Sequence, residues 1–237
     1  MTKRGKRYRE VYRQTDRSQA YTPQEAVELA RQQASARFPE TVELHLRTAS
    51  DPRHSDQLVR GVCSLPHGLG KSMQVLVFAS GEGALLAQEA SADFVGDEDL
   101  IKRIEGGWLE FDVAIATPDM MGRIGRLGRF LGRRGLMPNP RTGTVVAAED
   151  LPRAIAEAKK GRLEFRMDRT AVIHAPIGKA TFESRQLLDN LATFVDAVQR
   201  ARPSGVKGQF IRSAYLTTTM GPSIKLDLAS LLALRVE

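Results

Sequence analysis

Two different strand patterns occur in this sequence, and together they constrain its fold more than any other feature. Residues 41–47 alternate apolar Val and Leu with polar side chains, which is typical of a sheet with one buried and one exposed face. Residues 73–79, MQVLVFA, are instead an almost unbroken apolar run, as in a parallel sheet covered on both faces. The alternating pattern returns at 163–167 and 171–175. We therefore predict one domain made from both ends of the chain, with a second domain inserted into it.

The end segments predict an α/β domain with an antiparallel sheet. The stretch Thr22-Pro23-Gln24-Glu25 is typical of a helix start, because a hydroxyl cap precedes Pro in the first turn and Glu follows three residues after the cap. Apolar residues then recur at helical spacing from Ala26 through Ala34 to Phe38, so we expect this helix to run until Pro39. Further elements are expected as a strand over 58–65 paired with 41–47, a helix over 182–201, and strands over 208–218 and 223–228.

The middle segment predicts a Rossmann-like three-layer domain with a parallel sheet. Apolar strands and helical stretches alternate along it, and such alternation places helices on both faces of a parallel sheet. After the run at 73–79, we expect strands at 93–95 and 111–116, and helices over 82–91, 97–105, 119–131 and 151–160.

The charge of the chain follows the same division. The 237 residues carry 35 Lys and Arg against 28 Asp and Glu, a formal net charge of +7. Residues 1–67 hold 12 basic and 8 acidic residues (+4), and residues 160–237 hold 12 and 7 (+5). Residues 68–159 hold 11 and 13 (−2). We place the domain boundaries there, with a two-strand hinge at the crossings, and expect the basic discontinuous domain to bind a polyanion.

Several classes of protein are excluded by what the sequence lacks. No apolar run approaches the ~18 residues of a membrane-spanning helix, so we expect a cytoplasmic protein without membrane contact. The single cysteine, Cys63, excludes an internal disulfide framework and a zinc site built from thiolates. It lies four residues before His67, in a segment expected to be strand and then turn, and His45, His54 and His174 are scattered along the sequence. We therefore predict no catalytic residues, no metal site and no cofactor.

The segment 65–72, LPHGLGKS, half matches a phosphate-binding loop. Such a loop needs a glycine five residues before its Gly-Lys pair, so that backbone N–H groups can surround the phosphate. Leu65 occupies that position. A glycine hinge at the domain crossing is favoured, and a nucleotide-dependent enzyme is the alternative that a titration with ATP or GTP would test.

Five glycines and five arginines fall within residues 122–135. On a helix, Arg123, Arg126 and Arg133 would form a cationic face, which is either a solvated basic surface or a sequence-independent contact with phosphate. The run 207–222 differs, because residues 199–226 contain five basic residues, no acidic residue and several hydroxyls beside a Gly-Pro turn. Hydroxyls can meet phosphate or a ribose 2′-OH, so this run indicates either an RNA contact or an ordinary hairpin turn.

Six blocks of the sequence together resemble the ribosomal protein L-one family in its bacterial form, and they run through nearly the whole chain in the family's order. They are FPETVELHLR (38–47), DPRHSDQLVRGVCSLPHGLGK (51–71), GLMPNPRTGTV (135–145), FRMDRTAVIHAPIGK (165–179), RPSGVKGQFIRS (202–213) and TTTMGPS (217–223). The resemblance implies a discontinuous RNA-binding domain with an antiparallel sheet and an inserted parallel-sheet domain. Residues after 227 run past the usual family end, and we assign no role to this tail, 228–237.

Carried over by motif, the resemblance implies a set of RNA contacts in the discontinuous domain. We expect the hydroxyls to bond ribose or phosphate oxygens, the apolar residues to contact sugar or base, and the two acids to accept from 2′-OH or base amino groups. The implied contacts are Phe38, Thr41, Glu43, Asp168, Arg169, Ser213, Thr219, Met220 and Gly221.

The resemblance further implies a structural ribosomal protein and not an enzyme. Its expected partners are large-subunit ribosomal RNA at a mobile stalk, exit-site tRNA whose movement and release it assists, and its own operon mRNA, whose translation it represses. It would be a monomer when free of the ribosome. A general nucleic-acid binder without a ribosomal role is the second alternative, since basic flanks alone would permit it.

Overall fold

The computed structural model describes residues 5–16 and 18–235, and the chain divides into two compact units. Unit 1 comprises residues 1–70 and 163–237, and unit 2 comprises residues 71–162. Each observed boundary lies three residues beyond the corresponding predicted one. Within the described ranges, none of the helices is both long and apolar enough to span a membrane.

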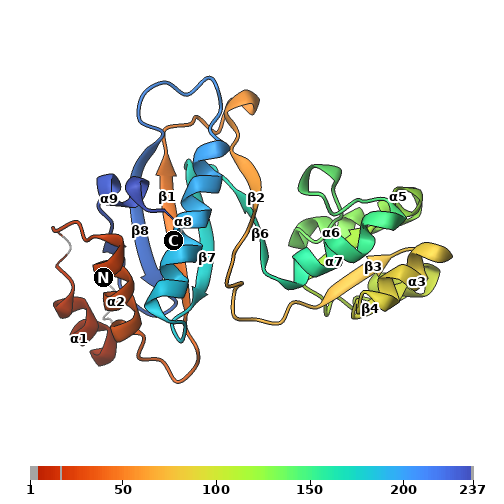
Figure 1. Ribbon diagram of the computed structural model, residues 1–237, viewed down its shortest axis with the longest axis horizontal. Helices are drawn as coiled ribbons and strands as arrows, with labels where there is room; N and C mark the ends of the chain where they lie inside the picture. The colour runs from red at the N-terminus through yellow and green to blue at the C-terminus, as the bar shows by residue number, and fades with distance from the viewer. Residues whose placement is uncertain (1–4, 17, 236–237) are drawn as a thin grey trace. The chain divides into compact units, whose positions relative to one another are not determined.

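Unit 1 is built on a four-stranded antiparallel sheet in the order β7-β1-β8-β9. One of its faces is covered by helices α2 and α8 (Figure 1). Alternation in β1 explains the arrangement, because Val42, Leu44 and Leu46 are fully buried while their neighbours lie on the other face. The elements are β1 (Thr41–Thr48), β7 (Val172–Lys179), β8 (Ile211–Thr218), β9 (Ile224–Lys225), α2 (Pro23–Gln33) and α8 (Ser184–Arg200).

The predicted start of α2 is confirmed, but its predicted end is wrong. Thr22 and Glu25 form the expected capping box. The helix ends at Gln33, because Ala34 takes an extended conformation and its N–H bonds back to the Arg31 carbonyl at 3.3 Å. The Ala36 N–H then donates to the buried Glu40 carboxylate at 2.8 Å instead of continuing the helix. Phe38 therefore lies in a loop and not on a helix.

The predicted partner of β1 is also wrong. The segment expected to pair with it forms β2 (Arg60–Ser64), which pairs with β6 (Arg162–Arg166) in a separate two-stranded sheet. Both edges of β1 are already occupied by β7 and β8, so no hydrogen-bonding edge is left for β2. The strands β2 and β6 are where the chain leaves and re-enters unit 1.

Two helices of unit 1 lie where no element was predicted. A basic segment near the N-terminus forms α1 (Lys6–Gln14), and none of the residues of this helix is buried. The C-terminal tail forms α9 (Leu228–Ala233), in which Leu231 is fully buried and Leu232 packs partly against the core. The tail therefore extends the core of unit 1 as far as Leu234, and residues 236 and 237 lie outside the described ranges.

Unit 2 confirms the predicted three-layer domain with a parallel sheet, in the order β4-β3-β5. Alternate residues of β3 point to opposite faces: Val75 and Val77 pack with α3 and α7, whereas Leu76 and Phe78 pack with α4, α5 and α6. The elements are β3 (Val75–Phe78), β4 (Phe94–Gly96), β5 (Val113–Ala116), α3 (Glu82–Glu89), α4 (Glu98–Glu105), α5 (Pro118–Ile124), α6 (Gly128–Arg134) and α7 (Leu151–Lys159).

The single helix predicted over 119–131 is two helices in the structure. A 3₁₀ turn, Gly125–Leu127, separates α5 from α6. Glycine disfavours the helix interior by about 1 kcal/mol relative to Ala, and four glycines fall within residues 122–132. The apolar spacing nevertheless persists through the break, because Ile124, Leu127 and Leu131 are all fully buried.

Candidate RNA interface

The face of the unit 1 sheet opposite α2 and α8 carries the polar residues of three strands. On β1 these are Thr41, Glu43 and His45, which are half-buried, and Arg47, which is exposed. The register places Thr217 of β8 opposite Glu43 and Ser213 opposite Arg47. At about 3.3 Å per residue, the eight residues of β1 give this strip of side chains a length of about 25 Å. We call it the polar strip.

At one end of the strip, the start of β1 is bonded to the residue that follows β8. The Thr219 N–H donates to the Thr41 carbonyl at 3.1 Å, and the Thr41 N–H donates to the Thr219 hydroxyl oxygen at 3.0 Å. The Lys179 ammonium donates to the Thr41 hydroxyl at 2.8 Å. The Thr219 hydroxyl, expected to be directed at RNA, therefore already closes the end of the sheet within the protein.

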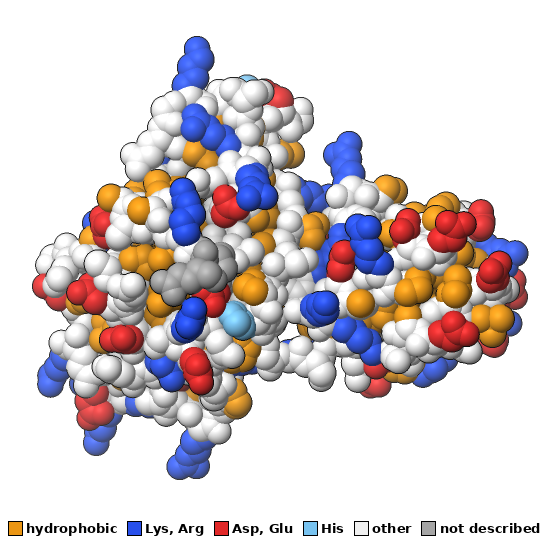
Figure 2. Space-filling view, in the orientation of Figure 1, with side chains coloured by type: hydrophobic (Ala, Val, Ile, Leu, Met, Phe, Trp, Pro, Cys, Tyr) orange, Lys and Arg blue, Asp and Glu red, His pale blue; other side chains and the backbone are white. Residues whose placement is uncertain are grey.

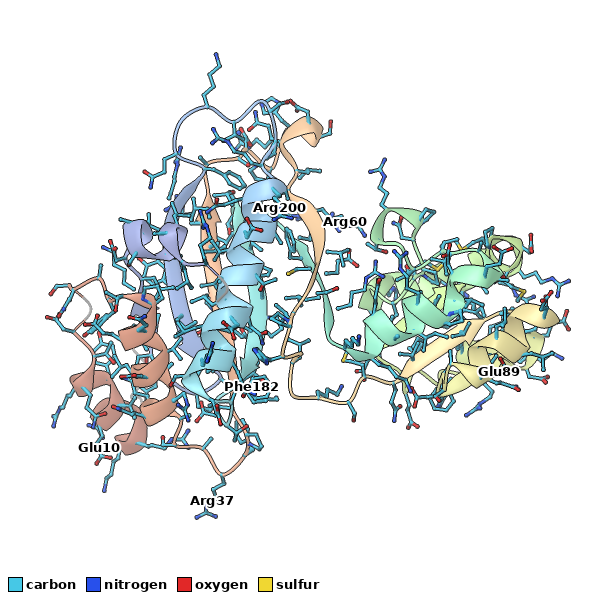
Figure 3. All side chains as sticks on the ribbon, in the orientation of Figure 1. Glu10, Arg37, Arg60, Glu89, Phe182 and Arg200 are labelled. Atoms are coloured by element: carbon cyan, nitrogen blue, oxygen red, sulfur yellow. The ribbon has the colours of Figure 1, made fainter. Side chains whose placement is uncertain are left out.

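The same end displays two large apolar side chains to solvent. Phe38 is 50% exposed and Met220 is 47% exposed, although most apolar residues of unit 1 are buried. Phe38 lies in the loop between α2 and β1, where the neighbouring Arg37 points outward (Figure 3). Gly221 follows Met220 in the turn after β8, and a Cβ at Gly221 would collide with the Thr218 hydroxyl. The missing side chain at Gly221 thus makes room for a close contact inside the protein.

Glu40 connects the two loops that carry these apolar residues. Its carboxylate accepts hydrogen bonds from the Ala36 N–H at 2.8 Å and from the Met220 N–H at 3.0 Å. Burial alone would raise the pKa of Glu40, but these N–H groups, with smaller effects of the Thr218 side chain and of Arg7, outweigh it and hold the pKa below its usual value. Because its pKa is lowered, Glu40 is ionised at neutral pH, although the residue is only 2% exposed.

At the other end of the strip, Asp168 organises the turn that leads into β7. Its Oδ1 accepts from the N–H groups of Thr170 and Val172, both at 2.8 Å. Burial opposes ionisation, but these bonds and the Thr170 hydroxyl lower the pKa of Asp168 to about 2. The carboxylate expected to read RNA is therefore largely engaged in shaping a turn, and this turn presents the exposed Arg169.

Two histidines judged to be scattered in the sequence meet at the middle of the strip. The register of β1 and β7 places His45 opposite His174, and their Nδ1 atoms are 2.8 Å apart. His45 Nε2 lies 2.9 Å from the Thr217 hydroxyl, and His174 Nε2 lies 3.4 Å from Asp168 Oδ2. With both rings neutral, one set of donors satisfies all three contacts. The Thr217 hydroxyl donates to His45 Nε2, His45 Nδ1–H donates to His174 Nδ1, and His174 Nε2–H donates to the Asp168 carboxylate.

The structure thus distributes the predicted contact residues along one strip. Phe38, Thr41, Thr219, Met220 and Gly221 gather at one end, Glu43 and Ser213 lie on the strands, and Asp168 with Arg169 lies at the other end. Sequence reasoning missed Glu40 and the His45–His174 pair. The alternation in each strand places both histidines on the exposed face, but only the register between β1 and β7 brings them together.

The half-matched phosphate loop has neither the shape nor the free lysine of a nucleotide site. Residues 65–74 contain no helix, and the next element is the strand β3. The Lys71 ammonium bonds to the Asp112 carboxylate at 2.6 Å. Gly70 has φ +69°, and a Cβ there would lie 2.8 Å from the Phe182 ring. Gly68 and Gly70, both with positive φ, thus allow the backbone to turn where the chain leaves unit 1.

Cys63 and His67 do not form a nucleophile and base. Burial, with a smaller effect of Asp196, raises the pKa of the Cys63 thiol to about 11, so the thiolate is scarce at neutral pH. His67 Nε2 instead faces the Asp189 carboxylate at 2.9 Å. Cys63 is 4% exposed and belongs to the core of unit 1.

The arginines expected to form a cationic face in unit 2 are partly neutralised. Arg123 pairs with Asp97 at 2.7 Å, and Arg126 pairs with Glu105 at 3.2 Å. On the face shown in Figure 2, the basic side chains of unit 2 are interspersed with acidic ones. The region is therefore closer to a mixed, solvated surface than to a concentrated phosphate site.

Comparison with known proteins identifies a family that covers most of the chain. The sequence model described as the ribosomal protein L1p/L10e family matches residues 30–222. The large ribosomal subunit protein uL1 of Dehalococcoides mccartyi is 54% identical over 234 residues, which cover 99% of each chain. Its counterpart in Thermomicrobium roseum is 58% identical over 231 residues, covering 97% of this chain and 96% of the relative. The protein of the same name in Chloroflexus aggregans is 52% identical over the full length of both chains.

Proposed function

The chain belongs to the ribosomal protein L1p/L10e family, and from this premise we propose that the polar strip of unit 1 binds large-subunit ribosomal RNA. The protein is a structural component of the large ribosomal subunit and not an enzyme. The proposed contacts are Phe38, Thr41, Glu43, Asp168, Arg169, Ser213, Thr219, Met220 and Gly221.

The observation that carries the proposal is the organised end of the strip. Phe38 and Met220 are exposed apolar side chains on loops that are held by a buried carboxylate and by the Thr41–Thr219 bonds. Side chains fixed before binding lose less conformational entropy when an RNA docks. Apolar and sulfur-containing groups can pack on the faces of sugars and bases that are accessible in folded RNA.

Acidic groups in the strip fit selection of RNA over other polyanions. Glu43 lies between Pro176 and Thr217 in the sheet, so any phosphate placed over it would meet a negative charge. A ribose 2′-OH can instead donate to such a carboxylate. Asp168 acts in this scheme by fixing the turn that presents Arg169, whose guanidinium suits phosphate geometry.

We extend the proposal to the remaining roles implied by the family resemblance. The protein would sit at the mobile stalk, contact exit-site tRNA and assist its release, with unit 2 joined to unit 1 through a two-strand hinge at β2 and β6. It would repress its own operon by binding the mRNA on the same strip. One strip holds one RNA, so ribosomal RNA and operon mRNA should compete for the monomeric protein.

The experiment that tests this function is competition at fixed salt. A ribosomal RNA fragment from the stalk, the operon leader mRNA and an unrelated RNA of equal length would compete for the labelled full-length protein. We expect the first two to displace each other and to exceed the unrelated RNA by a factor on the order of a thousand or more. Equal competition by all three would favour a general nucleic-acid binder instead.

A further inference from the structure

The structure assigns to Glu40 a positioning role in the RNA interface, an assignment that rests on the proposed function. Glu40 is not among the contacts implied by the family motifs, and at 2% exposure its carboxylate is nearly shut off from solvent. It joins loops that are 180 residues apart in the sequence, through the N–H groups of Ala36 and Met220. We call this arrangement the Glu40 clasp.

Each arm of the clasp holds an exposed apolar residue. Oε2 binds the backbone of Met220 itself, and Oε1 binds the backbone two residues before Phe38. The Glu40 carbonyl accepts a third bond, from the Ala180 N–H at 2.9 Å, which ties the clasp to the end of β7. Among the described residues, the nearest other bonds between these two segments are those of Thr41 with Thr219, which lie at the start of β1 and not within the loop that carries Phe38. The clasp therefore sets the spacing at which Phe38 and Met220 meet an RNA.

The chemistry of the clasp requires an ionised carboxylate of this length. Two acceptor oxygens face two N–H donors, and bonds to a charged acceptor are roughly twice as strong as neutral ones. Glutamine has the same shape, but its NH₂ group would face one of the two N–H donors. Glu40→Gln is thus expected to release one loop while leaving the fold and the surface side chains in place.

The test compares Glu40→Gln with Gln33→Ala, a matched control in the same unit. Gln33, the last residue of α2, is also 2% exposed, and its amide donates to the hydroxyl of Thr15, a residue outside both loops, at 2.7 Å. For each full-length variant, the affinities for the stalk RNA fragment and for unrelated RNA are measured over a salt series. We expect Glu40→Gln to lower the specific-to-unrelated ratio by about tenfold, the scale of one bond to a charged group, with the salt slope unchanged. Gln33→Ala should keep the ratio of the wild type.

A second measurement begins with the wild type, so its first result does not depend on how a variant folds. In the wild type, hydrogen exchange at the Ala36 and Met220 amides should be slow for loop residues, and Glu40→Gln should speed exchange at one or both of them. Fast exchange in the wild type would overturn the clasp. A variant with faster exchange but an unchanged specificity ratio would overturn the positioning role. If the wild type itself shows no specificity, the proposed RNA function fails, whatever the exchange rates show.

Discussion

Units 1 and 2 both expose arginines and apolar side chains, but they differ in how these groups are held. In unit 2, Arg123 pairs with Asp97, the residue before α4, and Arg126 pairs with Glu105 at the end of α4. Leu85 of α3 is 62% exposed. In unit 1, the exposed Phe38 and Met220 lie on loops fixed by a buried carboxylate. A surface suited to recognising RNA therefore differs from an ordinary one in the hydrogen bonds that hold its exposed side chains in place. The number of Lys and Arg residues on the surface is a weaker criterion.

The largest expected effect comes from removing a side chain at the end of the strip that carries Phe38 and Met220. Met220→Ala, or Thr219→Ala, should weaken binding of the stalk RNA by about 1–3 kcal/mol, the scale of a buried contact or a well-placed hydrogen bond. Filter binding at fixed salt measures it. Leu85→Ala in unit 2 is the matched control, and it should leave the affinity unchanged. Equal effects of the Met220 and Leu85 variants would erase the contrast between the units.

A smaller effect is expected from the turn after β8. Gly221→Ala places a Cβ against the Thr218 hydroxyl, so the turn or the Thr218 side chain must shift, and we expect a loss of about 1 kcal/mol in RNA affinity. Adding Thr218→Ala removes the obstacle and should restore most of the binding, with Thr218→Ala alone as the control. A double variant no better than Gly221→Ala would show that the clash is not the cause.

The histidine pair predicts a pH dependence of stability. Burial and the neighbouring His174 lower the pKa of His45, with Glu43 opposing. The unfolded chain therefore binds more protons as pH falls below about 6.5, so the stability contributed by neutral His45 is full above that pH and declines below it. The slope cannot exceed about 1.4 kcal/mol per pH unit for one group. In urea unfolding at about pH 7.5 and about pH 5.5, the wild type should lose more stability than His45→Gln. Equal losses of stability in the wild type and in His45→Gln would contradict the predicted contribution of neutral His45.

The smallest effect is expected in unit 2. Arg126→Ala or Arg133→Ala should change RNA affinity by about 0.5 kcal/mol or less, because exposed surface substitutions rarely do more. Any loss should be the same for specific and unrelated RNA and should reduce the salt slope. A loss of affinity confined to the specific RNA would show that unit 2 contributes to sequence-specific binding. The contrast drawn between the two units would then be wrong.

Much of the fold was predictable, because it depends on local periodicity. The alternation at 41–47 and the apolar run at 73–79 identified the half-exposed antiparallel sheet and the covered parallel sheet. Pairing of strands is not local, so β2 was given the wrong partner. The end of α2 was missed because the carboxylate of Glu40, seven residues beyond the last helical residue, accepts a hydrogen bond from the Ala36 N–H.

The candidate site was predictable only as a set of residues. Family motifs supplied the surface groups, but the bonds beneath them join positions such as His45 and His174, which are 129 residues apart. Spacing along a single sequence carries no information on such contacts. For the same reason, only the structure shows that the Thr219 hydroxyl and the Asp168 carboxylate accept hydrogen bonds from the protein's own backbone.

The most direct test of the central claim is to map the RNA contact on the full-length protein. Backbone amide signals of the labelled protein would be followed by NMR while the stalk RNA fragment is added. We predict that the largest changes fall on residues 36–47, 168–174 and 213–221, with those of unit 2 small by comparison. Changes concentrated in residues 122–135, with the polar strip unaffected, would contradict the account.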